Sequence, residues 1–183
     1  MVSLAVHDLR TPLATVVGFA RTLQRTELAS PQDQYVTMMV AASEQLGEIL
    51  DDLGVLARIE SERWEPNLQE VDSLELARSA AESLEGASAS GAGGTVRVDV
   101  EAAERALHGL ARCALRHGSL DAIGIEADGP DISVRPVTPA AAPVLMRETL
   151  RDFGAAVAAR ILAALGASVE LEDDRLVVRL PAA

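Results

Sequence analysis

The chain opens with residues 1–28, MVSLAVHDLRTPLATVVGFARTLQRTEL, and this stretch decides the fold of its N-terminal part. The apolar residues recur at alternating intervals of four and three, which is typical of helices packed as in a coiled coil. The repeat consists of Val2, Val6, Leu9, Leu13, Val16, Ala20 and Leu23. We therefore predict one long helix with a continuous apolar stripe.

A second helix with the same repeat is predicted after a break at residues 27–30. Ser30 is expected to be its N-cap and Pro31 its first helical residue. Because a short loop joins the two long helices, they should be antiparallel neighbours, with His7 level with about Leu53. The second stripe consists of Tyr35, Met39, Ala42, Leu46, Ile49, Leu53 and Leu56. This pattern predicts a helical hairpin domain over residues 1–62.

Two helices alone give little shelter to stripes of this length. Pairing with a second copy of the chain would bury them in a four-helix bundle with twofold symmetry. We therefore predict a homodimer. Its core is expected to contain Val6, Leu9, Leu13, Leu46, Ile49 and Leu53.

The polar residues beside the stripe have the chemistry of a phosphoryl acceptor. His7 follows Val6 and so should face solvent, and imidazole is a neutral nucleophile near pH 7. Asp8 can orient the ring through Nδ1–H and act as general base. Arg10 provides a planar cationic fork for phosphoryl or carboxylate oxygens. Thr11 lies one helical turn after His7, where its hydroxyl can position a water.

Residues 7–13, HDLRTPL, resemble the phosphoacceptor box of sensor histidine kinases at all seven positions. The resemblance implies that His7 carries a phosphoryl group on nitrogen and that Thr11 supports dephosphorylation of a receiver domain. A docked partner would touch Arg10, Ala14, Gly18 and the region 45–52, although ordinary helix packing also explains the two small residues. The alternative for the whole box is a solvated helix face. His108 and His117 lack such a context and are expected to be structural or surface residues.

Residues 67–183 predict an α+β sandwich whose order of elements resembles the ATP-binding domain of histidine kinases. Asp128-Gly129 is expected to be an ordinary hairpin turn. The closing hairpin should turn at Asp173-Asp174. The elements expected are a strand at 68–72, a helix at 73–85, a flexible loop at 87–94, a strand at 95–100, a helix at 102–117, strands at 120–126 and 131–137, a helix at 142–165 interrupted near Gly154, and a hairpin at 168–180.

The groups with which that family holds Mg²⁺ and ATP do not recur here. Cys113 and Gly109 stand at the positions of the metal-binding asparagines. The place of the adenine-reading aspartate is taken by Ala127 or, if the second strand of the pair leads into that motif, by the segment Pro136 to Pro139, again without an aspartate. Residues 152–156 keep one glycine of the last phosphate-binding cluster and add an acidic residue. The segment between Pro136 and Arg151 is too short for the usual lid. The expectation is a degenerate domain without nucleotide, cofactor or metal, with Mg²⁺ on a partner receiver domain.

The composition of the chain restricts the classes of partner and the compartment that it fits. A formal charge of −12 argues against a nucleic-acid footprint, and no apolar run is long enough to span a membrane. Cys113 is the single cysteine, which suggests a reducing compartment. With 49% hydrophobic but only 2% aromatic residues, the core must be aliphatic. We expect a cytoplasmic protein without a signal peptide, although family helices usually extend further before the histidine, so Met1 need not be the natural start.

The function that fits these features is a dimeric histidine phosphotransferase. It would relay phosphoryl groups between receiver domains of response regulators in a bacterial two-component phosphorelay, without ATP. A phosphatase or pseudokinase scaffold that acts on response regulators is the alternative, and an interaction module with an idle histidine is a third. An ATP-dependent sensor kinase fragment is the least favoured.

Overall fold

The computed structural model of the chain describes residues 2–26, 28 and 30–183, with side chains from residue 6 onward in that range. The chain divides into two compact units, Met1–Arg63 and Trp64–Ala183. Residues 27 and 29 of the predicted break lie outside the described residues. Within the described part of the chain, no helix combines the length and the apolar content that a membrane span needs.

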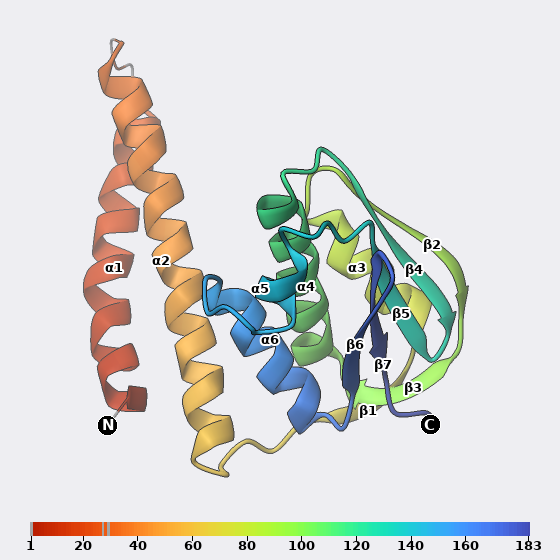
Figure 1. Cartoon of the computed structure of the whole chain (residues 1–183). Helices are drawn as coiled ribbons and strands as arrows, with labels where there is room; N and C mark the ends of the chain where they lie inside the picture. Colours follow the sequence, from red (N-terminus) through yellow and green to blue (C-terminus); the bar gives the residue numbers. More distant parts are fainter. Residues whose placement is uncertain (1, 27, 29) are drawn as a thin grey trace. The chain divides into compact units, whose positions relative to one another are not determined.

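The first unit is an antiparallel hairpin of two helices, α1 (Val2–Gln24) and α2 (Gln32–Glu60), as predicted (Figure 1). Helix α1 continues through Pro12. The predicted start of α2 is wrong by one residue, because Pro31 precedes the first helical residue and no side chain caps the helix. Ser30 is therefore not its N-cap.

The register of the hairpin follows from contacts between the two helices. A Cβ built on Gly54 would lie 3.8 Å from Cγ1 of Val6, and Arg10 forms an ion pair with Asp51. The position of His7 next to Val6 therefore lies level with residues 53 and 54, as counting from the loop had indicated.

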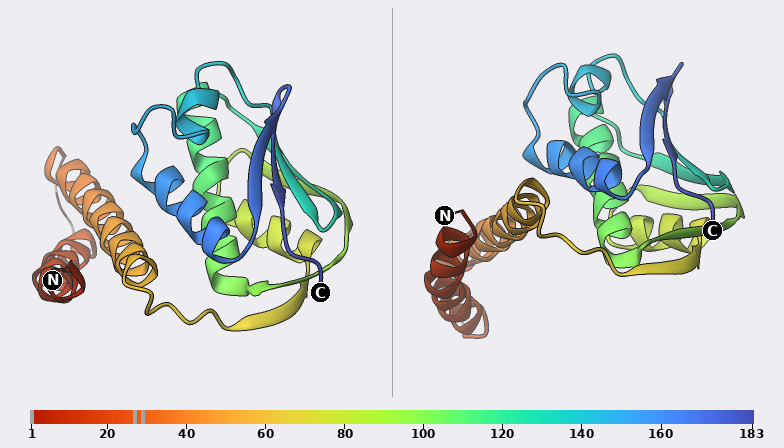
Figure 2. Two further views of the ribbon diagram at one scale, coloured as in Figure 1. Left: turned by 60° about the horizontal axis from the view of Figure 1, so that its bottom comes forward. Right: turned by 90° about the horizontal axis from the view of Figure 1, so that it is seen from below.

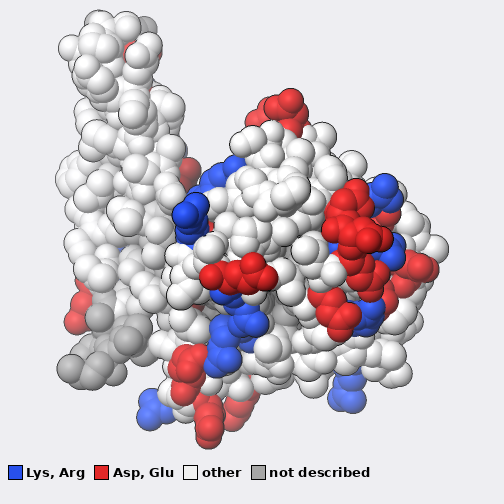
Figure 3. All heavy atoms as spheres, viewed as in Figure 1, with Lys and Arg blue, Asp and Glu red and all other residues white. Residues whose placement is uncertain are grey.

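Helix α2 has two apolar stripes, whereas the sequence repeat predicted one. Val36, Val40 and Leu50 are buried against α1, and the predicted stripe beside them is left largely exposed. Val6 is buried within the hairpin itself, so it is not available to the dimer core predicted for it. The hairpin surface in view carries few charged side chains (Figure 3). Its exposed large apolar residues are Leu9, Val16, Phe19, Leu23, Tyr35, Met38, Met39, Leu46 and Ile49.

The second unit is an α/β sandwich. Its elements in order are β1 (Leu68–Asp72), α3 (Ser73–Glu82), β2 (Ala87–Gly93), β3 (Thr95–Asp99), α4 (Val100–Gly118), β4 (Ile123–Gly129), β5 (Asp131–Arg135), α5 (Ala142–Leu145), α6 (Phe153–Ala164), β6 (Ser168–Glu172) and β7 (Arg175–Arg179). Strands β1 and β3 form a small antiparallel sheet, and the larger sheet has the order β2-β4-β5-β7-β6. In the larger sheet β2 pairs with β4 in parallel, and the other pairs are antiparallel. Helices α3, α4 and α6 lie against one face of this sheet (Figure 2).

Aspartates start the three main helices of this unit. Asp72, Asp99 and Asp152 each precede a helix and accept a hydrogen bond from a backbone N–H of its first turn. A carboxylate at this position satisfies a free amide and interacts favourably with the helix dipole. These caps set where α3, α4 and α6 begin.

The core between the helices and the sheet is aliphatic, as the composition required. Strands β4 and β5 bury alternate residues, which is the pattern of a sheet covered on one face, whereas β7 buries the three consecutive residues Leu176, Val177 and Val178. The largest fully buried side chains are Leu76, Leu107, Leu110, Ile125, Ile132, Leu145, Ile161, Leu162, Leu176, Val96, Val98 and Val134. This core holds α4 and α6 in place, and their contact forms the second site described below.

The segment 87–94, predicted as a flexible loop, is instead the edge strand β2 and a short connection. It pairs in parallel with β4 over seven positions. A Cβ on Gly91 would lie 2.1 Å from the carbonyl oxygen of Ala127, and Gly91 has a φ of +105°. The small residues are thus needed for close approach to β4 rather than for flexibility.

The helix predicted over 142–165 with an interruption near Gly154 is indeed interrupted, but the break is longer than expected and lies earlier in the chain. The chain forms the short helix α5, leaves helical conformation at residues 146–152 and resumes as α6 at Phe153. The interruption therefore precedes Gly154 and ends at the Asp152 cap. The two hairpin turns were predicted correctly, because Asp128 pairs with Asp131 around Gly129 and Glu172 pairs with Arg175.

Candidate functional site

The His7 side chain stands out from the hairpin. It is 80% exposed, and its Nδ1 lies 3.4 Å from Oδ1 of Asp8, itself 68% exposed. This geometry leaves Nε2 directed away from Asp8 and open to a partner. A carboxylate near Nδ1 favours the tautomer in which Nδ1 carries the proton and Nε2 is the nucleophile.

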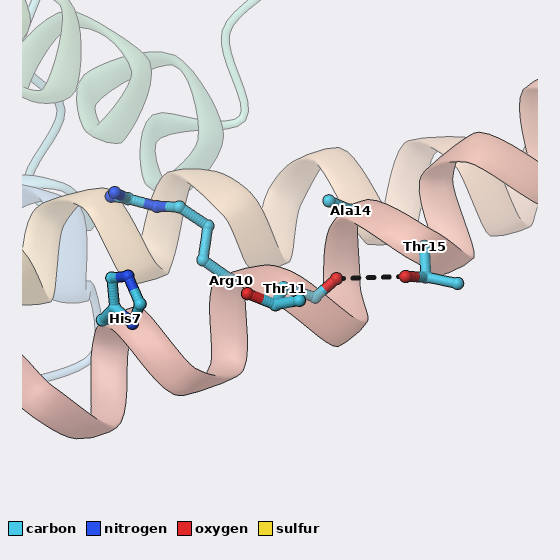
Figure 4. A pocket seen from close by; sticks show the side chains of 5 residues that line it. All are labelled: His7, Arg10, Thr11, Ala14 and Thr15. Carbon is cyan, nitrogen blue, oxygen red and sulfur yellow. Dashed lines mark hydrogen bonds between the residues drawn. The ribbon is translucent and has the colours of Figure 1, made fainter.

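A shallow pocket of about 470 Å³ adjoins the histidine along α1. Figure 4 shows how its five lining residues lie, with the Thr11 side chain on the same side of the helix as the His7 ring. Thr15 donates a hydrogen bond of 3.2 Å from its Oγ1 to the backbone oxygen of Thr11. The lining residues are His7, Arg10, Thr11, Ala14 and Thr15. Gly18, predicted to share the docking surface, does not line this pocket, although the space where its Cβ would lie is open.

Arg10 crosses to the second helix rather than standing free. Its Nη2 donates to Oδ1 of Asp51 at 2.5 Å, and both side chains are about half exposed. This pair holds the guanidinium beside the pocket. An incoming phosphoryl or carboxylate group would have to compete with Asp51 for it.

A second cluster of functional side chains lies where α4 meets α6. Oδ1 of Asp152 accepts from the Ala155 amide at 3.0 Å, and Oδ2 accepts from Arg116 Nη2 at 2.5 Å. Nε2 of His117 lies 3.1 Å from the same Oδ2. Cys113, one turn before His117 on α4, is buried, and its thiol donates a hydrogen bond to Asp152. One carboxylate thus ties the start of α6 to three side chains of α4.

The ionisation of this cluster follows from its packing. Burial acts to raise the pKa of Asp152, but the hydrogen bond from Ala155 and the charges of Arg116 and His117 outweigh it and hold the pKa below its usual value. Burial, and then the nearby Asp152 carboxylate, raise the pKa of the Cys113 thiol to about 12. Asp152 is therefore an anion and Cys113 a neutral thiol at neutral pH.

Gly109, at the position where the family resemblance expects an asparagine, packs against the start of α6. A Cβ at this position would lie 3.5 Å from the backbone oxygen of Gly154 and 3.5 Å from Cβ of Ala158. The backbone of α6 thus fills the space that a longer side chain on α4 would need.

Sequence reasoning missed both Asp51 and the contact of Asp152 with α4. Asp51 lies on the predicted second helix at the level of Arg10, so the hairpin register contained the signal. The second cluster joins residues 113–117 to residue 152, and only the packing of α6 on α4 brings them together. His117 is half-buried with its Nε2 3.1 Å from Oδ2 of Asp152, and Nδ1 of His108 lies 3.1 Å from Oγ of Ser83, so both have structural contacts.

Known sequences resemble the hairpin part of the chain. Residues 1–62 match the model of the His Kinase A (phospho-acceptor) domain. Over 71 residues, 39% of this chain, the sequence is 34% identical to the aerobic respiration control sensor protein ArcB of Escherichia coli (strain K12). It is 34% identical over 58 residues, 32% of the chain, to the autoinducer 2 sensor kinase/phosphatase LuxQ of Vibrio cholerae. These matches cover only 9% of ArcB and 7% of LuxQ.

Two solved structures resemble all or nearly all of the chain, and a third resembles about two thirds of it. Full-length ShkA in complex with AMPPNP covers all of it with a TM-score of 0.71 at 24% identity, and the match spans 46% of ShkA. The histidine kinase AdeS of Acinetobacter baumannii covers 96% with a TM-score of 0.62 at 15% identity, over 97% of that chain. The ATP binding domain of PrrB from Mycobacterium tuberculosis covers 64%, with a TM-score of 0.51 and 20% identity, over 98% of its length. The chain therefore has a histidine-kinase-like α+β fold, in which a two-helix hairpin similar to the His Kinase A phospho-acceptor domain precedes a domain that resembles the histidine kinase ATPase domain.

Proposed function

We propose that the chain is a dimeric histidine phosphotransferase, which accepts a phosphoryl group on His7 from one receiver domain and passes it to another without using ATP. One observation carries the proposal. The His7 ring is exposed beside the Asp8 carboxylate, as a nucleophile requires, while the positive end of the α6 helix dipole is already occupied by the Asp152 carboxylate. The similarity to histidine kinases supports a role in two-component signalling.

The transfer needs little from the protein beyond positioning. Nε2 of His7 forms a P–N bond as the P–O bond to the receiver's aspartyl carboxylate breaks, and that aspartate leaves as a carboxylate. Nδ1 keeps its proton, and Asp8 stabilises the positive charge that the ring acquires. A second receiver aspartate reverses the step. In-line placement of the reacting atoms provides most of the catalysis, and Mg²⁺ is expected on the receiver.

The side chains where α4 contacts α6 do not fit the Mg²⁺ and ATP that a kinase-like fold implies. Mg²⁺ prefers oxygen ligands, and Cys113 offers a neutral, buried thiol. A helix N-terminus can bind phosphate through its free amides. At α6 Asp152 has taken that role, and its negative charge would repel a phosphate. We therefore propose that nucleotide does not bind there.

The exposed stripe of the hairpin supports association with a second copy. Among the described side chains of the two helices, nine large apolar residues are exposed, and such a face is unfavourable in water unless it is covered. Of the predicted dimer core, Leu9, Leu46 and Ile49 are exposed, while Leu13 and Leu53 are half-buried and keep part of their surface for a partner. We propose a four-helix bundle in which these residues meet their twofold mates.

Phosphoryl transfer can be tested in two incubations. With labelled ATP and Mg²⁺ the protein should acquire no phosphohistidine, and with a phosphorylated receiver domain it should be labelled transiently. His7→Gln should abolish the second signal. His108→Gln, a change at a histidine of the second unit, should leave it intact. ATP-dependent labelling of His7 would refute the transferase proposal.

A phosphatase acting on response regulators is the second candidate, because Thr11 lines the same pocket as His7. If its hydroxyl positions the attacking water, Thr11→Ala should slow receiver dephosphorylation while His7→Gln does not. Thr15→Ala is the matched control, since its hydroxyl is engaged with the Thr11 carbonyl. Loss of phosphate that needs His7 but not Thr11 would favour the transferase.

A further inference from the structure

The contact between α4 and α6 brings together a set of metal-ligand atoms that the phosphotransferase chemistry does not use. Sγ of Cys113, a ring nitrogen of His117 and a carboxylate oxygen of Asp152 all lie within 4.8 Å of one another. Cys113 and His117 are four residues apart on α4, so they share one face of the helix, and Asp152 is held in place by its cap on α6. We propose that these three residues form a site for Zn²⁺ or a similar transition-metal ion.

The donor set selects the class of ion. Thiolate and imidazole are the ligands of Zn²⁺ and related borderline ions, and one carboxylate completes a three-residue set with a fourth position for water. The thiolate and the carboxylate would together balance a divalent charge. Mg²⁺ and Ca²⁺ prefer oxygen donors throughout, so they are excluded as occupants.

The geometry is close to that of a formed site. Bonds of about 2.0–2.3 Å in a tetrahedron place ligand atoms about 3.5 Å apart. The most widely separated of the three atoms therefore need to approach by up to about 1.3 Å, a movement on the scale of a side-chain rotation. Cys113 is 1% exposed and the Asp152 side chain 9% exposed, so a bound ion would be largely shielded from water.

Two features oppose binding and make the proposal testable. The thiol must lose its proton to bind an ion, and its buried position opposes that loss, so metal binding should strengthen as the pH rises. Arg116 donates to Oδ2 of Asp152, the oxygen that also faces His117, and so competes with the ion for that oxygen. The Arg116 side chain is 55% exposed and can turn into solvent when an ion binds.

The test is titration of the full chain with Co²⁺, followed by displacement with Zn²⁺. Because Cys113 is the single cysteine, a thiolate-to-cobalt charge-transfer band in the near ultraviolet would report this site alone. We expect one equivalent of Co²⁺ to produce the band and Zn²⁺ to remove it. Cys113→Ser should abolish it, and His117→Gln and Asp152→Asn should each weaken binding by about tenfold or more.

Matched variants separate this site from adventitious binding. His7→Gln and His108→Gln, the two other histidines, should leave the band and the affinity unchanged. Arg116→Gln should tighten binding, because it removes the competing guanidinium without touching the buried side chains, and circular dichroism checks that every variant is folded. Absence of the band, or a band of equal strength after His117→Gln and Asp152→Asn, would overturn the proposal. So would weaker binding in Arg116→Gln. The result is independent of phosphoryl transfer at His7, because none of these three ligands lies in the hairpin.

Discussion

Truncation of one exposed leucine tests the proposed dimer quantitatively. Leu46 lies on the second apolar stripe of α2, and 53% of its surface remains exposed in the single chain. Leu46→Ala removes three carbon groups worth about 0.8 kcal/mol each when fully buried, or about 2.4 kcal/mol. Because roughly half of this burial is still to be gained on association, the loss is about 1.3 kcal/mol per copy and about 2.5 kcal/mol per symmetric dimer. At about 1.4 kcal/mol per factor of ten, the dimer Kd should rise roughly 60-fold.

The assay is sedimentation equilibrium over a range of protein concentrations, with circular dichroism to follow helix content. Leu150→Ala is the matched control, because Leu150 is 84% exposed but lies in the second unit, and its Kd should equal that of the unchanged chain. A hairpin that works as a monomer predicts a different outcome. Alanine is the better helix former, so Leu46→Ala would then leave association and stability unchanged or slightly improved. That result would refute the assignment of this stripe to a dimer interface.

Three further substitutions test the second unit, and a fourth, Gly18→Ala in α1, serves as a comparison. In metal-free protein, Asp152→Asn should keep the helix cap but remove a carboxylate whose folded-state pKa lies below its unfolded value near 3.9. The stability that this charge contributes is present above that value and is lost as the pH falls through the folded pKa. Thermal unfolding measured from pH 5 to pH 2 should therefore depend less on pH in the variant than in the unchanged chain. Gly91→Ala should destabilise the second unit, because its Cβ would clash with the Ala127 carbonyl oxygen. Gly18→Ala lies at an open helical position and should instead stabilise α1 by up to about 1 kcal/mol. Thermal melts measure both changes. Leu107→Ala, at a fully buried position, should lower the free energy of unfolding in urea by about 2–5 kcal/mol, and a loss below about 1 kcal/mol would contradict the packing of α4.

Most elements of the fold could be predicted because local patterns carry them. The alternation of four and three identified the hairpin, and strand alternation with turn residues identified β1, β3 and the pairs at Asp128 and Asp173. The failures lie where a long-range contact overrides a local preference. Residues 87–94 have the composition of a loop, yet pairing with β4 makes them a strand, since the sheet supplies hydrogen bonds that the segment could not form alone.

The phosphoacceptor part of the candidate site was visible in consecutive residues, because a helix places His7, Thr11 and Asp8 by sequence spacing alone. The partner of Arg10 was within reach of the same reasoning, since the hairpin register sets Asp51 beside it. The burial of Val6 could not be predicted in this way. Two apolar stripes on α2 compete for the face that packs against α1, and only the packed hairpin shows which of them is buried.

The sequence by itself determined the helical hairpin, the exposed histidine and its neighbours, and most of the strands and helices that follow, because each depends on periodicity or on adjacent residues; strand β2 is the exception. Tertiary structure alone decided the meeting of Cys113, Arg116 and His117 with Asp152. Their two segments are more than thirty residues apart, and no local pattern indicates that α6 starts against α4. Packing of the two helices over a shared aliphatic core, with the Asp152 cap at the point of contact, brings these groups within bonding distance.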